Sequence, residues 1–118
     1  MVLTKIFLRG GMVILFLFFI SCSYNTIDKV APAVNEVKKG EKFTIILPEN
    51  HIENYHWKLK DDYDQTVLDY IGSVWHGNEK GVYYNFSAKR SGIDTLKLTQ
   101  YKLQDSVKSV IYIIRVSE

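Results

Sequence analysis

The sequence predicts an all-β domain, an antiparallel β-sandwich of about seven to eight short strands. Apolar and polar residues alternate in several short segments, which is the pattern of a half-buried strand. Polar or glycine-containing turn signals separate these segments at intervals of about eight to twelve residues. No segment shows a sustained helical period, so helices are not expected in the folded part.

Alternation predicts most of the strands directly. It places them at residues 42–47, 55–60, 82–88 and 94–101. Residues 107–116 are apolar on both faces, so this segment is expected to be a central strand. Residues 66–71 predict a short strand, and residues 72–81 predict a loop with Gly77-Asn78 as its turn signal.

Aromatic residues in this region allow two interpretations. Tyr83, Tyr84, Phe86 and Trp75 would suit an exposed platform on which sugars stack. A sandwich without disulfides also needs large side chains in its core, and aromatic residues favour strands. Core packing is therefore expected for Tyr84 and Phe86, while both interpretations stay open for Tyr83 and Trp75.

The first twenty-two residues predict an export signal rather than a part of the fold. Lys5 and Arg9 give a positive start, and residues 12–20 form an apolar run that is too short to span a bilayer comfortably. Cys22 follows where a bacterial lipoprotein signal places its lipidated residue. We expect a membrane-anchored lipoprotein of the cell envelope, on its periplasmic or cell-surface face. A cleaved signal with an incidental cysteine, or an uncleaved anchor, are the alternatives.

The rest of the chain divides into a tether and one domain. Residues 23–39 are polar and predict a tether, with a first edge strand near residues 34–37 as an added element. Residues 40–118 are expected to form the sandwich. Because Cys22 is the only cysteine, this domain has no disulfide, thiol nucleophile or cysteine metal site.

Charge and composition exclude several function classes. Without Lys5 and Arg9 the chain has 13 basic residues against 13 acidic ones, so no nucleic-acid partner is expected. There is no nucleophile-elbow motif and no phosphate-binding glycine loop, so we expect no enzyme and no cofactor. A monomer is expected.

Metal binding is a weaker alternative. His51, Glu53 and His56 lie close in sequence, but their spacing is not that of a helical zinc motif. Residues 61–69 are acidic, yet Gly72 stands where a calcium loop needs glutamate. We therefore expect no metal site; a metal-binding lipoprotein would show a melting temperature that shifts with zinc or calcium.

The segment between the first two strands is a short polar loop, residues 50–54. A loop held by two stiff strands is a common way to present a binding surface. The run from Gly40 to Trp57 resembles the chagasin-like family of cysteine-protease inhibitors, whose loop reads Asn-Pro-Thr-Thr-Gly and is followed by Tyr-x-Trp. Asn50, Tyr55 and Trp57 match this pattern at the same spacing.

This resemblance extends over roughly residues 37–116 and implies a fold, a partner and a site. The fold would be an immunoglobulin-like sandwich with Trp57 in its core. The partner would be a papain-like cysteine protease, whose active-site cleft three loops from one end of the sandwich block without a covalent bond. The implied protease-binding residues are Asn50, His51, Ile52, Glu53, Asn54, Gly77, Asn78, Glu79, Lys80, Gly81, Tyr101, Lys102, Leu103 and Gln104.

Several positions depart from the family pattern. His51 stands at the proline position, which removes a fixed φ. Glu53 stands at the second threonine, where its carboxylate would be repelled by a thiolate or would pair with an imidazolium. Asn54 stands at the glycine position, and asparagine is the residue that most readily accepts a positive φ. The third loop keeps a positive charge at Lys102 but lacks the family's tryptophan.

These departures leave a second hypothesis open. It is a cell-envelope binding or assembly lipoprotein that uses the same face for a protein or a glycan and inhibits no protease.

Overall fold

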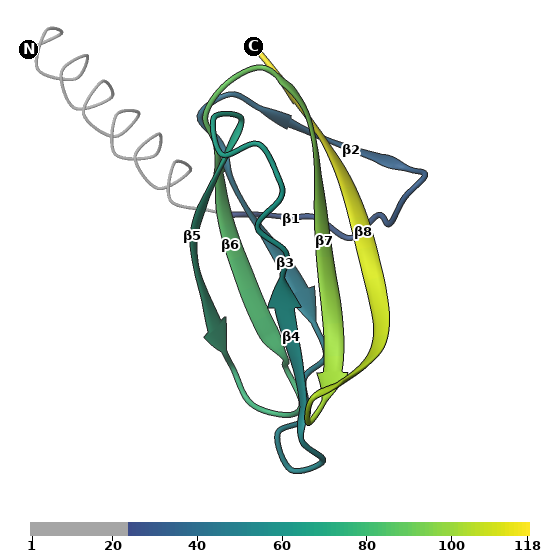
Figure 1. The fold of residues 1–118 in the computed structure, drawn as a ribbon. Coiled ribbons are helices and arrows are strands. Elements are labelled where there is room, and N and C mark those ends of the chain that lie inside the picture. The colour runs from purple at the N-terminus through teal and green to yellow at the C-terminus, as the bar shows by residue number, and fades with distance from the viewer. Residues whose placement is uncertain (1–23) are drawn as a thin grey trace, which may run out of the picture.

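The computed structural model describes residues 24–118, which form eight strands in two sheets and contain no helix (Figure 1). The strands are β1 (Asn25–Thr26), β2 (Val34–Lys38), β3 (Lys42–Leu47), β4 (Tyr55–Leu59), β5 (Leu68–Trp75), β6 (Val82–Ala88), β7 (Gly92–Lys102) and β8 (Asp105–Ser117). The all-β sandwich predicted from the sequence is confirmed. Because none of residues 24–118 is helical, this part of the chain offers no helix that could cross a membrane. The predicted signal and Cys22 lie outside the described residues.

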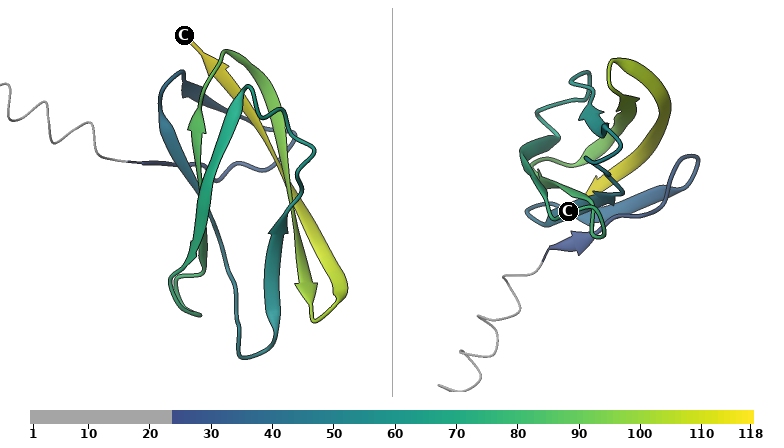
Figure 2. Two further views of the ribbon diagram at one scale, coloured as in Figure 1. Left: turned by 60° about the vertical axis from the view of Figure 1, so that its left-hand side comes forward. Right: turned by 90° about the horizontal axis from the view of Figure 1, so that it is seen from below.

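The two sheets pack face to face as two layers (Figure 2). One has the order β1-β3-β6-β5 and the other the order β2-β8-β7-β4. Buried side chains from both sheets point between the layers and form one core. Its fully buried side chains are Phe43, Phe86, Ile45, Leu68, Leu96, Leu98 and Ile114.

Strands predicted from alternation are confirmed, with ends that differ by a few residues. The segment expected to be central is β8, which lies between β2 and β7. Trp57, Tyr84 and Phe86 are buried, as expected for core residues. Alternation predicted these elements well because each of the strands has one face in the core and one face in solvent.

The short strand predicted at residues 66–71 and the loop predicted at residues 72–81 need correction. β5 begins at Leu68 and runs to Trp75, so its second half occupies the first part of the expected loop. A bulge between Tyr70 and Gly72 shifts the register against β6 and interrupts the alternation. The sequence around Gly72 therefore has the composition of a loop although it is paired.

The tether predicted at residues 23–39 also needs correction, because parts of it pair with the sheets. The edge strand expected near residues 34–37 is confirmed as β2, which lies at the edge of its sheet. β1 pairs in parallel with β3, and β2 pairs in parallel with β8. Ile27 and Val37 from this segment belong to the core. Both partner strands are distant in sequence, so these pairs leave little local pattern. Part of the expected tether therefore belongs to the two sheets and to the core of the described residues.

Candidate functional site

Three loops meet at one end of the sandwich (Figure 1). The tip loop, residues 48–54, crosses from β3 in one sheet to β4 in the other. Two hairpin turns flank it: the second loop, residues 76–81, joins β5 to β6, and the third loop, residues 103–104, joins β7 to β8. The tip loop projects furthest from the sheets (Figure 2).

Hydrogen bonds connect the tip loop to both of its neighbours. The backbone N–H of His51 donates to the Asn78 side-chain oxygen at 3.0 Å. On the other side, the N–H of Leu103 donates to the carbonyl oxygen of Asn54 at 3.1 Å. Segments that lie far apart in the sequence therefore form one continuous surface, built from the predicted site segments 50–54, 77–81 and 101–104.

Asn50 and Asn54 set the shape of the tip loop. The Asn50 side-chain oxygen accepts hydrogen bonds from the N–H groups of Ile52 at 3.0 Å and Glu53 at 3.3 Å. The backbone carbonyl oxygen of Asn50 accepts a hydrogen bond from the Tyr55 N–H at 3.0 Å. Asn54 has a φ of 64°, as its place at the family's glycine position predicted. Asparagine side chains stabilise turns in this way, so the loop holds its own conformation.

Glu49 is the site residue that sequence reasoning missed. It is only 6% exposed, although it follows Pro48 at the start of the loop. One carboxylate oxygen accepts the backbone N–H of Trp57 at 2.6 Å, and the other lies 2.6 Å from Nε2 of His51. The Trp57 ring N–H donates in turn to the carbonyl oxygen of Pro48 at 2.6 Å. Glu49 therefore connects the exposed loop to the start of β4.

The imidazole of His51 is held on a second side by Trp75. The two rings stack at 4.0 Å between centroids with an interplanar angle of 16°. The Trp75 ring N–H donates to the carbonyl oxygen of Glu49 at 3.2 Å. Three contacts therefore hold His51, and they come from Glu49, Trp75 and Asn78. They stand in place of the rigid ring that a proline would supply. No local signal identifies Trp75 as a partner, because 24 positions of sequence separate it from His51.

Tyr84, in the core, contacts β4 just beyond the tip loop. The Tyr84 hydroxyl donates to the carbonyl oxygen of Trp57 at 2.9 Å. Burial raises the pKa of this phenol far above its ordinary value, and the nearby Glu49 carboxylate adds to the effect. Tyr84 therefore stays a neutral hydrogen-bond donor beneath the loop.

The exposed apex of the site is apolar. Ile52, at the middle of the tip loop, is 82% exposed, and Leu103 of the third loop is 63% exposed. Between these loops lies a shallow depression of about 220 Å³, lined by His51, Asn54, Tyr55, His56 and Leu103. Ile52 and Leu103 therefore give the apex of the site a small exposed apolar surface.

Gly81 ends the second loop at a place where no side chain fits. Its φ is 84°, and a Cβ atom there would overlap the carbonyl oxygen of Leu47 in β3. Gly77 accepts the Gly81 N–H through its carbonyl at 2.8 Å, which closes the turn. Glu79 and Lys80 are exposed at its tip. The second loop is therefore pinned against the base of the tip loop.

Aromatic and cationic side chains support the third loop. The Tyr101 ring stacks on His56 at 5.7 Å, and the Lys102 ammonium lies 5.2 Å from the centre of the Tyr55 ring. Leu103 turns the chain with a φ of 56°, and Gln104 is exposed beside it. Where the family pattern has a tryptophan, this loop offers the exposed leucine.

The histidines have separate partners, since His51 contacts Glu49 and Trp75 while His56 stacks on Tyr101. Among residues 24–118, no three His, Cys, Asp or Glu side chains are grouped as metal ligands. The acidic segment, residues 61–69, is ordered by hydrogen bonds within it. The Asp64 side chain accepts from the N–H of Thr66 at 2.9 Å and from its hydroxyl at 2.6 Å.

Comparison with solved structures finds the same fold in two proteins. The cysteine protease inhibitor EhICP2 from Entamoeba histolytica superposes with a TM-score of 0.64 at 14% identity, covering 79% of this chain and 92% of its own. Amebosin superposes with a TM-score of 0.54, also at 14% identity, covering 80% of this chain and 99% of its own. The fold implied by the chagasin-like resemblance is confirmed. No family model matches the sequence, and no curated protein matches it.

Proposed function

We propose that this chain is a reversible, non-covalent inhibitor of papain-like cysteine proteases, with residues 50–54 wedged into the active-site cleft. The observation that carries the proposal is the tip loop itself. It is held by Glu49, Trp75 and Asn78 and presents Ile52 almost free of contacts. A loop that is rigid before binding loses little conformational freedom on binding, which favours affinity.

The chemistry of the target suits a wedge of this kind. Papain-like proteases attack with a thiolate that is paired with an imidazolium. The tip loop offers no cysteine and forms no covalent bond, so it acts by excluding the substrate. Glu53 is exposed at the tip, where its carboxylate meets both charges of that pair. Its net effect on affinity is therefore small compared with that of an apolar anchor.

The comparisons support the inhibitor class at the level of the fold. EhICP2 is a cysteine protease inhibitor, and this chain superposes on most of its length at 14% identity. The loop residues are particular to this chain, so its target protease has to be found by experiment.

The first test is a titration of papain and a cathepsin L-type enzyme with residues 23–118. We expect stoichiometric, reversible inhibition with a dissociation constant between about 1 nM and the low micromolar range. Asn50→Ala should weaken inhibition by about tenfold, because two loop N–H groups lose their acceptor. Lys89→Ala, in the β6–β7 turn at the opposite end, is the matched control and should change nothing.

Absence of inhibition at tens of micromolar by a folded domain would contradict the proposal. The chain would then be assigned to the alternative class, a binding or assembly module of the cell envelope. Spectra of each variant establish that the domain is folded, so a negative result is informative.

Export and anchoring complete the proposal. Cys22 is proposed as a lipidated N-terminal residue that holds a monomeric inhibitor at the membrane of the cell envelope. Metabolic labelling with an alkyne fatty acid should mark the full chain expressed in a bacterium, and Cys22→Ser should abolish the label. A label retained by Cys22→Ser would show that the anchor lies elsewhere.

A further inference from the structure

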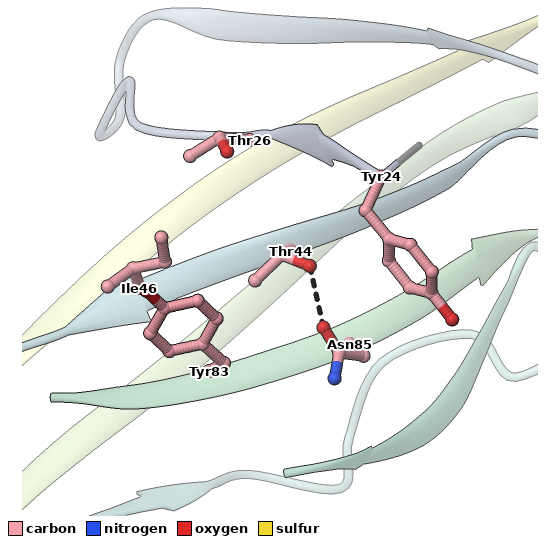
Figure 3. A pocket seen from close by; sticks show the side chains of 6 residues that line it. All are labelled: Tyr24, Thr26, Thr44, Ile46, Tyr83 and Asn85. Atoms are coloured by element: carbon pink, nitrogen blue, oxygen red, sulfur yellow. Dashed lines mark hydrogen bonds between the residues drawn. The ribbon is translucent and has the colours of Figure 1, made fainter. Parts of the chain in front are cut away.

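We propose that the outer face of the β1-β3-β6-β5 sheet carries a binding site for a neutral sugar, between the rings of Tyr24 and Tyr83. A depression of about 430 Å³ lies there, open to solvent (Figure 3). Its lining residues are Tyr24, Thr26, Thr44, Ile46, Tyr83 and Asn85. Ligand pockets in proteins span about 300–1,000 Å³, so the volume suits a short saccharide.

The N-terminal strand builds one wall of this site. β1 pairs in parallel with β3, with Thr26 opposite Thr44. The N–H of Ile27 donates to the carbonyl oxygen of Thr44 at 2.9 Å, and the Ile27 side chain is buried. Tyr24 is therefore held above the sheet by a segment anchored in the core.

Two paired strands form the floor. Thr44 lies opposite Asn85 and Ile46 lies opposite Tyr83 in the β3–β6 register. The Thr44 hydroxyl donates to the Asn85 side-chain oxygen at 2.6 Å, which orients the amide. The amide nitrogen of Asn85 has no hydrogen-bond acceptor among residues 24–118, so it is available as a donor to a ligand.

Both tyrosine rings are supported from outside the site. The Lys42 ammonium lies 5.8 Å from the centre of the Tyr24 ring, and the His76 ring lies 4.2 Å from that of Tyr83. Figure 3 shows the two rings on the same side of the sheet, with Thr44 and Asn85 between them. The arrangement is two aromatic surfaces around a polar floor.

The chemistry of the lining selects a neutral, hydroxyl-rich ligand. None of the six side chains is charged, so a phosphate or carboxylate would find no opposite charge among them. A wholly apolar ligand would cover the exposed Thr26 hydroxyl and the Asn85 amide nitrogen without replacing their hydrogen bonds to water, which is unfavourable. A pyranose ring satisfies both requirements, because its C–H face contacts tyrosine and its hydroxyl groups pair with threonine and asparagine.

This site is separate from the proposed protease surface. It lies on the outer face of one sheet, whereas the three loops lie at the end of the sandwich. The two sites adjoin where His76 of the second loop contacts Tyr83, whereas Tyr24 is remote from the loops in sequence and lies on β1's side of the depression.

The test is an NMR titration of residues 23–118, labelled with ¹⁵N, against maltotriose, cellotriose, mannotriose and chitotriose at up to about 20 mM. We expect at least one of them to shift the amide signals of Thr44, Ile46 and Asn85 saturably, with a dissociation constant of the order of 1 mM or tighter. If none of the four shifts these signals saturably, the proposal is wrong.

Variants locate the site. Tyr24→Ala should weaken the binding of that sugar by about tenfold or more, a loss of about 1.4 kcal/mol. Tyr24 is outside the core, so this variant folds; Tyr83→Ala should act in the same way. Tyr101→Ala removes a partly exposed tyrosine of the other sheet and is the matched control. Equal affinities in all three variants would overturn the proposal, and Tyr24→Ala should leave protease inhibition unchanged.

Discussion

Two carboxylates are buried at opposite ends of the sandwich, and only one of them reaches the exposed loops. Glu49, beneath the tip loop, is 6% exposed and has a partner on each oxygen, the Trp57 N–H and the His51 ring. Asp94, near the start of β7, is 8% exposed. Its Oδ1 accepts from the N–H groups of Asp64 at 3.0 Å and Thr95 at 2.9 Å. Its Oδ2 is buried and has no partner among residues 24–118.

The difference shows that the two buried carboxylates have different roles in this fold. Asp94 fixes a turn that faces away from the loops, and its unpaired oxygen is a cost to the domain. Glu49 fixes the side chain that stands at the family's proline position. We infer that Glu49 supports both stability and inhibition, whereas Asp94 supports stability alone.

The largest effect is expected from Glu49→Ala. It leaves the Trp57 N–H without its acceptor and releases His51, so the free energy of unfolding should fall by about 2–3 kcal/mol. Protease inhibition should weaken at least tenfold. Asp94→Ala is the matched variant and should lower stability while leaving the inhibition constant unchanged. Urea unfolding measures the stability of both variants, and protease titration measures their inhibition constants. Equal losses of inhibition would contradict the proposed difference between Glu49 and Asp94.

Ile52→Ala should separate inhibition from stability. The side chain is 82% exposed, so the free energy of unfolding should change by less than about 0.5 kcal/mol. Its loss as an anchor should raise the inhibition constant by about thirtyfold, or about 2 kcal/mol. Ile93→Ala, at the opposite end and 62% exposed, is the control. An unchanged inhibition constant in Ile52→Ala would remove the tip loop from the interface.

Asp94→Asn should change how stability depends on pH. Burial raises the pKa of the Asp94 carboxyl above its ordinary value, and the Asp64 and Asp62 carboxylates add to this. A raised pKa means that the folded state binds the proton more tightly, so stability from Asp94 is present below about pH 4 and is lost as pH rises through the folded pKa.

Asp94→Asn has no carboxyl group at this position, so it does not lose this stability as pH rises. Its stability relative to the natural chain should therefore increase between about pH 3 and pH 7, by roughly 1 kcal/mol or less. Urea unfolding across this range measures the difference. A pH-independent difference would mean that Asp94 has no raised pKa in the folded domain.

The smallest effect is expected from Glu53→Thr, which restores the family's residue at the tip. Because Glu53 is exposed, stability should stay within about 0.5 kcal/mol. Inhibition should be preserved or become tighter by up to about tenfold. Titration at low and high salt separates a charge effect from a shape effect. A weaker inhibitor would show that Glu53 makes a favourable contact with the protease.

The tip loop itself was largely predictable. Asn50 and Asn54 were assigned from the resemblance to the family loop, and Asn54 has the positive φ expected of it. The hydrogen bonds of the Asn50 side chain are an addition from the structure. Glu49 and Trp75 were not predicted, since the burial of Glu49 depends on Trp57, eight positions away, and the partner of Trp75 is 24 positions away in the sequence. A glutamate after Pro48 has the same appearance whether it is buried or solvated.

What the sequence by itself determined is the set of alternating strands β3, β4, β6 and β7, the central place of β8, and the short polar loop between β3 and β4. Alternation is a local property, so it survives without knowledge of the partner strands. Only the tertiary structure decided the pairing of β1 and β2 with their partner strands, the contacts between the three loops, and the burial of Glu49. These features depend on pairs distant in sequence, and such contacts form only when the whole sandwich closes.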